Sequence, residues 1–188
     1  MLNPREILNR IDAMFSARGG EEYFGEAVTQ LEHALQCAWL AEQERQPESV
    51  IVAALLHDVG HLLHGHGEDY LNKNIDDRHE ELGARFLKRA FSLEVTEPIR
   101  LHVPAKRYLA ASRAGYLELL SPASAKSLQL QGGPMTKDEA RAFEQEPYYE
   151  IAAKVRMYDD RAKVVGLKTP SYEHFREYLA RELTPDNS

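Results

Sequence analysis

The chain has 188 residues, of which 43% are hydrophobic and 28% are charged, a composition typical of a globular domain in water. Its net charge of −7 argues against a nucleic-acid partner, and no apolar run approaches the ~18 residues of a membrane span. A single cysteine excludes an internal disulfide framework, and the first residues lack the layout of a signal peptide. We therefore expect a cytoplasmic protein that neither binds nucleic acid nor enters a membrane.

Apolar residues recur with helical spacing through nearly the whole chain. Helices are predicted, in chain order, over residues 4–17, 26–44, 48–63, 76–91, 95–111, 121–131, 136–146, 147–163 and 172–184. Prolines at 98 and 104 are expected to interrupt the fifth of these helices. Strand alternation and hairpin turn pairs are not convincing anywhere, and the polar stretch 64–77 is expected to be a lid or rim. The sequence therefore predicts an all-α fold in one domain, residues 1–188.

The second and third predicted helices are expected to form much of the core. A helical stripe in the second is apolar and is predicted to be buried: Val28, Leu31, Leu35, Trp39 and Leu40. Cys37, in the same segment, is interpreted as a small buried hydrophobe rather than a nucleophile. The helix over 48–63 is almost entirely apolar for two turns, as expected of a central helix.

Six side chains that can coordinate a metal interrupt these helices: His33, His57, Asp58, His79, His102 and Asp159. Taken alone, each histidine is more often a satisfied core residue, and Asp159 resembles a solvated acid. Together, four imidazoles and two carboxylates suffice for two divalent ions such as iron, manganese or zinc. Asp58, adjacent to His57, is well placed to bridge two ions.

These residues resemble a known superfamily. The order His33, His57-Asp58 and Asp159 resembles the HD-domain proteins, an all-helical fold, and His79 and His102 resemble its dinuclear branch. Five stretches extend the likeness over most of the chain: EAVTQLEHALQCAWLA, AALLHDVGH, RHEELGA, HVPAKRYL and QGGPM. They resemble the HD-domain mixed-valent diiron oxygenases of phosphonate breakdown.

The resemblance implies a single HD-domain helical bundle with two iron ions, Fe(II)/Fe(III), held by the six side chains. It implies that O2 and a small phosphonate are the reactants and that the C–P bond of a 1-hydroxyphosphonate is cleaved. The substrate would be 2-amino-1-hydroxyethylphosphonate or its N-trimethyl analogue, and the products glycine or glycine betaine with inorganic phosphate.

Two basic residues are candidates for holding the phosphonate. Lys106 lies four residues after His102, and Arg156 lies three before Asp159, so each shares a helical face with a candidate ligand if the helix is continuous there. Both match phosphonate contacts of the family. Taken alone, each would be an ordinary surface cation.

Three further polar residues are candidates for the same anion site. His61 lies four residues after His57 and is expected on the same face of one helix. Ser124 and Gln131, which flank the segment SAKSLQLQ, complete the set. The remaining histidines are interpreted as loop or surface residues: His64, His66 and His174.

The stretch EYFGEAV carries Tyr23 and Glu26. The resemblance implies that Tyr23 ligates one iron until substrate arrives, and that Glu26 meets the cationic nitrogen of the substrate. Gly25, with the Gly19-Gly20 pair, would be the hinge. The aromatic face of Phe24 leaves a quaternary ammonium possible. The alternative is a helix N-terminus in which Tyr23 packs on the core and Glu26 favours the helix dipole.

Two other functions remain open from the sequence. A metal-dependent HD phosphohydrolase would use two ions to activate water against a small phosphate ester. A non-catalytic helical module would keep the metals for stability alone. Dependence on O2 separates the oxygenase from the hydrolase.

Overall fold

The computed structural model describes residues 2–63 and 78–185; the predicted rim at 64–77, with His64 and His66, lies outside them. Its elements, in chain order, are α1 (Pro4–Arg18), β1 (Glu22–Tyr23), β2 (Glu26–Thr29), α2 (Gln30–Gln43), α3 (Glu48–Leu56), α4 (Val59–Leu63), α6 (His79–Leu87), α7 (Leu93–Ser112), η1 (Leu117–Leu119), α8 (Pro122–Leu130), α9 (Lys137–Phe143), α10 (Tyr149–Arg161) and α11 (Tyr172–Glu182). The predicted all-α fold is confirmed, apart from one small hairpin.

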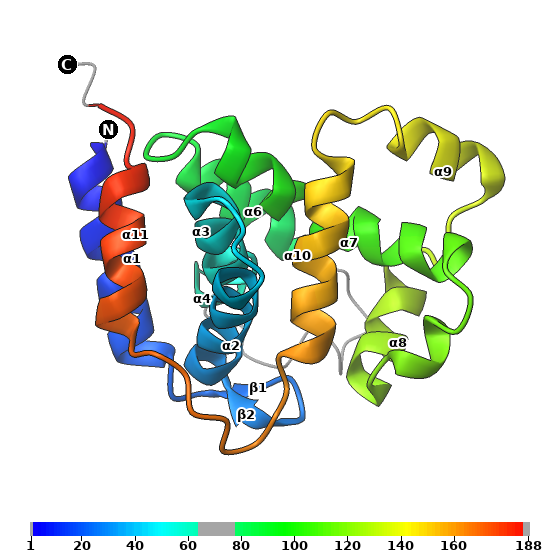
Figure 1. The fold of residues 1–188 in the computed structure, drawn as a ribbon, viewed down its shortest axis with the longest axis horizontal. Helices are drawn as coiled ribbons and strands as arrows, with labels where there is room; N and C mark the ends of the chain where they lie inside the picture. The colour runs from blue at the N-terminus through cyan, green and yellow to red at the C-terminus, as the bar shows by residue number, and fades with distance from the viewer. Residues whose placement is uncertain (1, 64–77, 186–188) are drawn as a thin grey trace.

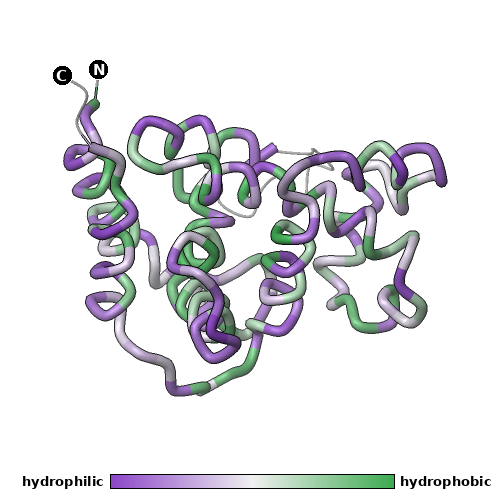
Figure 2. Tube along the Cα trace, turned by 45° about the horizontal axis from the view of Figure 1, so that its top comes forward, coloured by the Kyte–Doolittle hydropathy of each residue, from purple (hydrophilic) through white to green (hydrophobic). Residues whose placement is uncertain are grey.

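Helix α3 lies at the centre of the bundle, in contact with α2, α7, α10 and α11 (Figure 1). Every residue from 50 to 56 is buried, because the segment is apolar on all sides. Figure 2 shows hydrophobic residues gathered along the centre of the bundle, whereas α1 and α11 alternate between hydrophilic and hydrophobic. Among the described residues, no helix combines the length and hydropathy needed to cross a membrane.

The first and last helices lie side by side at one end of the molecule (Figure 1). The rings of Phe15 and Tyr172 are 5.2 Å apart, and the Tyr172 hydroxyl donates a hydrogen bond to Asp12. Arg176 pairs with the same carboxylate. Both helices bury their apolar faces in the core that α3 fills, and one domain over 1–188 stays a prediction.

The start of α2 corrects the prediction of a helix from residue 26. Thr29 accepts a hydrogen bond from the Glu32 backbone, and the Glu32 carboxylate accepts one from the Thr29 backbone. This capping box begins the helix at Gln30. Residues 26–29 pair instead with 22–23 as an antiparallel hairpin.

The buried face of α2 also differs from the predicted stripe. Val28 is buried, but the larger residues Leu31, Leu35, Trp39 and Leu40 are only partly buried. The face turned to the core carries small residues, among them Ala34, Cys37, Ala38 and Ala41. Small side chains let α2 pack closely against α3 and α10.

Helix α7 is continuous, so the prediction of a break at its prolines was wrong. Pro98 and Pro104 both lie inside the 20-residue helix. A proline removes a hydrogen-bond donor and strains the preceding turn. The helix nevertheless continues because it is packed against α3, α6 and α10, with Val95, Ile99 and Leu101 buried.

Candidate metal centre

The His57-Asp58 pair lies at a turn between two helices rather than inside one. Helix α3 ends at Leu56 and α4 begins at Val59. The His61 backbone N–H donates to the Asp58 carbonyl, which closes the turn. The expectation that His57 and His61 share one helical face was therefore wrong. The break separates them: His57 is fully buried behind the pocket, and His61 borders it.

A first cluster lies deep between α2, the turn and α10. The Nε2 atoms of His33 and His57 are 3.2 Å apart. The Asp159 carboxylate lies 3.5 Å from the first nitrogen and 3.9 Å from the second. Each Nδ1 is 2.8 Å from a backbone carbonyl, that of Ala162 for His33 and that of Ala54 for His57. Both Nε2 atoms therefore face one point.

A second cluster borders the pocket. The Nε2 atoms of His79, on α6, and His102, on α7, are also 3.2 Å apart. They lie 3.3 and 3.4 Å from Oδ1 of Asp58, and His61 Nε2 lies 3.9 Å from the same atom. The Nδ1 of His102 is 2.7 Å from the Ile99 carbonyl.

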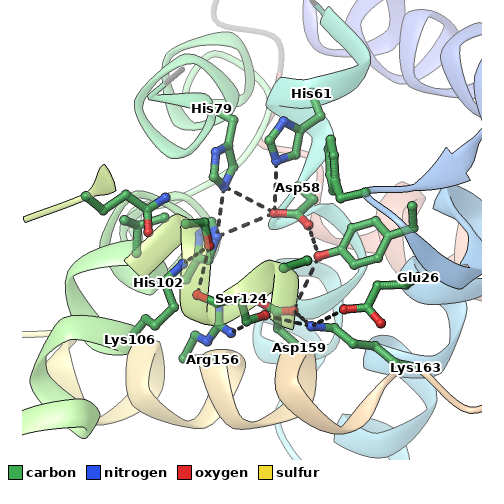
Figure 3. Close-up of a pocket in the computed structure, with 16 residues that line it drawn as sticks. Glu26, Asp58, His61, His79, His102, Lys106, Ser124, Arg156, Asp159 and Lys163 are labelled. Carbon is green, nitrogen blue, oxygen red and sulfur yellow. Dashed lines mark hydrogen bonds and ion pairs between the residues drawn. The ribbon is translucent and has the colours of Figure 1, made fainter. Parts of the chain in front are cut away.

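Asp58 joins the two clusters, and Figure 3 shows its side that faces His61, His79 and His102. Its Oδ1 faces His79 and His102, whereas its Oδ2 lies 3.4 Å from His57 Nε2 and 3.7 Å from His33 Nε2. One carboxylate thus presents one oxygen to each pair of imidazoles. This is the arrangement of a carboxylate that bridges two ions.

The imidazoles of His33 and His102 are in the neutral form that binds metal. Where Nδ1 donates to a carbonyl, Nε2 carries a lone pair, and two lone pairs 3.2 Å apart repel each other unless a cation lies between them. Two ligand atoms at about 2.1 Å from one ion lie about 3 Å apart, which these distances match. Burial lowers the pKa of His33 and of His102 to about 4, so both are neutral at pH 7.

The carboxylates complement these rings. Burial favours the neutral acid, but Arg156 and then Lys163 lower the pKa of Asp159. Burial acts in the same way on Asp58, whose pKa the imidazoles of His57 and His102 lower well below its usual range. Burial acts against the charged form of His57, but the Asp58 carboxylate raises the pKa of that imidazole above its usual value. Two ionised carboxylates and four imidazoles fit two divalent ions.

Cys37 lies beside the deep cluster, with Sγ 3.7 Å from His33 Nε2. Burial raises the pKa of its thiol well above the usual range, so the group is not a thiolate. The prediction of a small buried hydrophobe is confirmed.

A single pocket gathers every candidate for substrate contact, together with four of the six candidate ligands. It is lined by Tyr23, Phe24, Glu26, Asp58, His61, His79, His102, Val103, Lys106, Ala123, Ser124, Ser127, Gln131, Arg156, Asp159 and Lys163. His33 and His57 lie behind this lining. A ligand in the pocket therefore meets the second cluster directly.

The hairpin places Tyr23 and Glu26 together. Phe24 and Gly25 both have positive φ, 46° and 75°, and the two-residue turn pairs Tyr23 with Glu26 across the strands. Of the predicted hinge glycines, Gly25 is in the left-handed region, whereas Gly19 ends α1 in a right-handed conformation. The alternative of a helix N-terminus at this segment was wrong.

The Tyr23 hydroxyl reaches the carboxylates of both clusters. It donates to Asp58 Oδ2 at 2.7 Å and lies 3.4 Å from Asp159 Oδ1. Its ring stacks on His33, with centroids 3.8 Å apart. Burial, and then the charges of the two carboxylates, raise the pKa of Tyr23 well above its usual range.

The opposite wall of the pocket is cationic. Lys106, on α7, donates to Ser127 Oγ at 2.8 Å. Burial, and then the charge of Arg156, lower the pKa of Lys106 to about 7. Arg156, on α10, lies 2.5 Å from Asp159 and also pairs with Asp160. The continuous α7 brings Lys106 to the site as its spacing predicted.

Lys163 and Ser127 belong to this lining but were missed in the sequence. Lys163 follows Asp159 by four residues, the same interval that singled out Lys106 after His102. The same four-residue spacing would have identified Lys163 from the sequence. Ser127 offered no signal beyond its place on α8. His174 is exposed and pairs with Glu42, as predicted for a surface residue.

Comparison with known proteins agrees with this architecture. The HD domain family matches residues 30–164, and the chain belongs to it. The chain is 44% identical over 180 residues to 1-hydroxy-2-(trimethylamino)ethylphosphonate dioxygenase (glycine-betaine-forming) of Leisingera caerulea, covering 96% of this chain and 92% of that protein. It is 48% identical over 157 residues to hydroxymethylphosphonate dioxygenase of Gimesia maris, covering 83% and 78%. The resemblance to the HD-domain oxygenases of phosphonate breakdown is thus confirmed, and the chain belongs to that family.

Proposed function

We propose that this protein uses O2 to cleave the C–P bond of a 1-hydroxyphosphonate, giving a carboxylic acid and inorganic phosphate. The position of Asp58, with one oxygen toward each histidine pair, is the observation that carries the proposal. The substrates implied by the sequence are 2-amino-1-hydroxyethylphosphonate and its N-trimethyl analogue. The relatives add hydroxymethylphosphonate as a third substrate of the same class.

Two iron ions fit the two clusters. His33, His57 and Asp159 would hold one, and His79 with His102 would hold the other, with Asp58 shared. An Fe(II)/Fe(III) pair supplies the electron that O2 needs to react with an organic substrate. Because His79 and His102 line the pocket, the substrate would lie beside their ion.

The pocket residues would bind and orient the phosphonate. Lys106 and Arg156 supply positive charge for its oxygens, and His61 and Ser124 supply donors. Gln131 also faces the site, and its Oε1 is buried without a hydrogen-bond partner among the described residues. Fixing the anion at several points holds C1 close to the metal centre, which favours reaction by proximity.

Tyr23 would act as a gate. The hydroxyl lies at the carboxylates of both clusters, and a nearby cation lowers the pKa of a phenol and favours the phenolate. A phenolate of Tyr23 held by the metal would keep O2 out until the substrate took its place. Its place on a two-residue hairpin with strained φ at Phe24 suits a segment that moves.

A Tyr23→Phe variant tests this gate. The resting protein loaded with Fe(III) should show a visible tyrosinate-to-iron absorption band, which disappears when substrate is added. The variant should lack the band and lose activity faster when kept in air without substrate. A band that persists in the variant would show that another residue is the ligand.

O2 dependence tests the proposed reaction against hydrolysis. The iron-loaded protein is incubated with each of the three hydroxyphosphonates, in air and under strict anaerobiosis. We expect one O2 consumed per phosphate released, and no phosphate without O2. Anaerobic phosphate release, or turnover of a phosphate monoester, would favour the phosphohydrolase.

Metal removal tests the third function. If the wild type has no activity and metal removal only lowers its melting temperature, the protein is a non-catalytic module.

A further inference from the structure

Lys163 lies between the cationic wall, formed by Lys106 and Arg156, and the hairpin, two residues after the end of α10 (Figure 3). Its Nζ donates to Ser124 Oγ at 2.9 Å and lies 3.6 Å from Glu26 Oε1 and 3.9 Å from Asp159 Oδ1. It also lies 5.8 Å from the centre of the Tyr23 ring. The side chain is only 12% exposed, so its charge is directed into the pocket.

Glu26 is only partly satisfied by this lysine. Its Oε1 is buried and has no hydrogen-bond partner among the described residues. Lys163 is close enough to supply charge, but at 3.6 Å it is beyond an ordinary hydrogen bond. A buried carboxylate oxygen without a hydrogen bond is stabilised when a second cation or donor enters the pocket.

Ser124 connects Lys163 to the phosphonate side of the pocket. Its Oγ accepts from Lys163 and lies 3.5 Å from the Arg156 guanidinium. With both lone pairs directed at cations, its O–H is left to donate to a ligand oxygen. Lys163 can therefore serve a phosphonate and Glu26 from nearly the same position.

We propose that Lys163 is a specificity-determining residue, which competes with a cationic nitrogen on the substrate for Glu26. This inference rests on the proposed function. A substrate that carries an ammonium takes Glu26 and leaves Lys163 to the phosphonate. A substrate without one leaves Lys163 shared between Glu26 and the phosphonate. Lys163 thus sets the preference between 1-hydroxyphosphonates with and without positive charge, the feature in which the named substrates of the two relatives differ.

Two non-reacting ligands isolate this effect. 2-Aminoethylphosphonate and propylphosphonate have nearly the same shape and differ in one group, an ammonium in place of a methyl. Their dissociation constants are measured by calorimetry on the metal-loaded wild type and on Lys163→Met, Glu26→Gln and the double variant. The quantity compared is the preference ratio, the dissociation constant of propylphosphonate divided by that of 2-aminoethylphosphonate.

We expect Lys163→Met to raise the preference ratio about tenfold, because Glu26 is then free for the ammonium. Glu26→Gln should lower the ratio, and adding Lys163→Met to it should leave the ratio unchanged. Lys154→Met, an exposed lysine of α10, is the matched control and should change neither constant. Lys163→Gln replaces the methionine variant if that variant does not fold by circular dichroism.

An equal loss of affinity for both ligands in Lys163→Met, or no change, would overturn the proposal, since Lys163 would be only an anion contact or no contact. A change in ratio that persists in the Glu26→Gln background would also overturn it. The proposed function fails separately, if the wild type binds both ligands but releases no phosphate from any hydroxyphosphonate. A wild type that releases phosphate from a hydroxyphosphonate but binds neither ligand would overturn this inference alone.

Discussion

Replacing Asp58 with asparagine is expected to weaken both metal sites at once. The carboxylate presents Oδ1 to His79 and His102, and Oδ2 to His33 and His57. Among the described residues, no other candidate ligand presents a coordinating atom to both clusters. Asparagine has the same shape but no charge and only one ligand oxygen. Activity should fall by more than the roughly 10–100-fold that loss of an outer-shell partner costs.

Metal content per chain, measured by mass spectrometry after iron loading and desalting, checks this expectation. The Asp58→Asn variant should retain less than half of the wild-type iron, with an unchanged circular dichroism spectrum. Asp138→Asn, at an exposed carboxylate on α9, is the control and should retain all of it. Full iron content in Asp58→Asn would show that the two clusters do not depend on a shared carboxylate.

The identity of the candidate ligands was accessible from the sequence, but their division into two clusters was not. Histidine and aspartate in apolar helices are rare enough to be noticed, so Asp58 could be predicted to bridge. Which histidines lie together depends on the break after Leu56, which turns His57 toward the core and leaves His61 at the pocket. Asp58 and Gly60 are residue types that favour turns, but the apolar pattern resumes at Val59 and Leu62, which favoured one continuous helix.

Two other predictions of local structure were wrong because tertiary packing outweighs local preference. The hairpin at Tyr23 and Glu26 uses Phe-Gly in its turn, without the Asn-Gly or Asp-Gly pair by which such turns are recognised. Pro98 and Pro104 predict a broken helix from local preference, whereas tertiary contacts keep α7 whole. Lys106 could reach the pocket only because that helix is continuous.

Gly60→Ala is expected to disturb the second cluster while leaving the first in place. A Cβ at residue 60 would lie 2.0 Å from the His79 carbonyl oxygen, so α4 and α6 can approach this closely only through glycine. The neighbour is backbone, which cannot rotate away, and α6 must shift with His79 on its first turn. Overpacking of this kind costs about 1–3 kcal/mol, which corresponds to a fall in melting temperature of roughly 2–12 °C.

Gly20→Ala is the matched control, since a Cβ there meets nothing within 4 Å and the residue does not have positive φ. We expect the control to keep its melting temperature and its iron. Gly60→Ala should lose the ion near His79 and His102 and retain the one between His33 and His57, so that about half of the iron remains. Loss of all the iron would show that the deep cluster cannot hold an ion without the other, and unchanged iron would show that His79 does not hold one. The contrast with Asp58→Asn is informative because one change displaces a terminal ligand and the other removes the shared one.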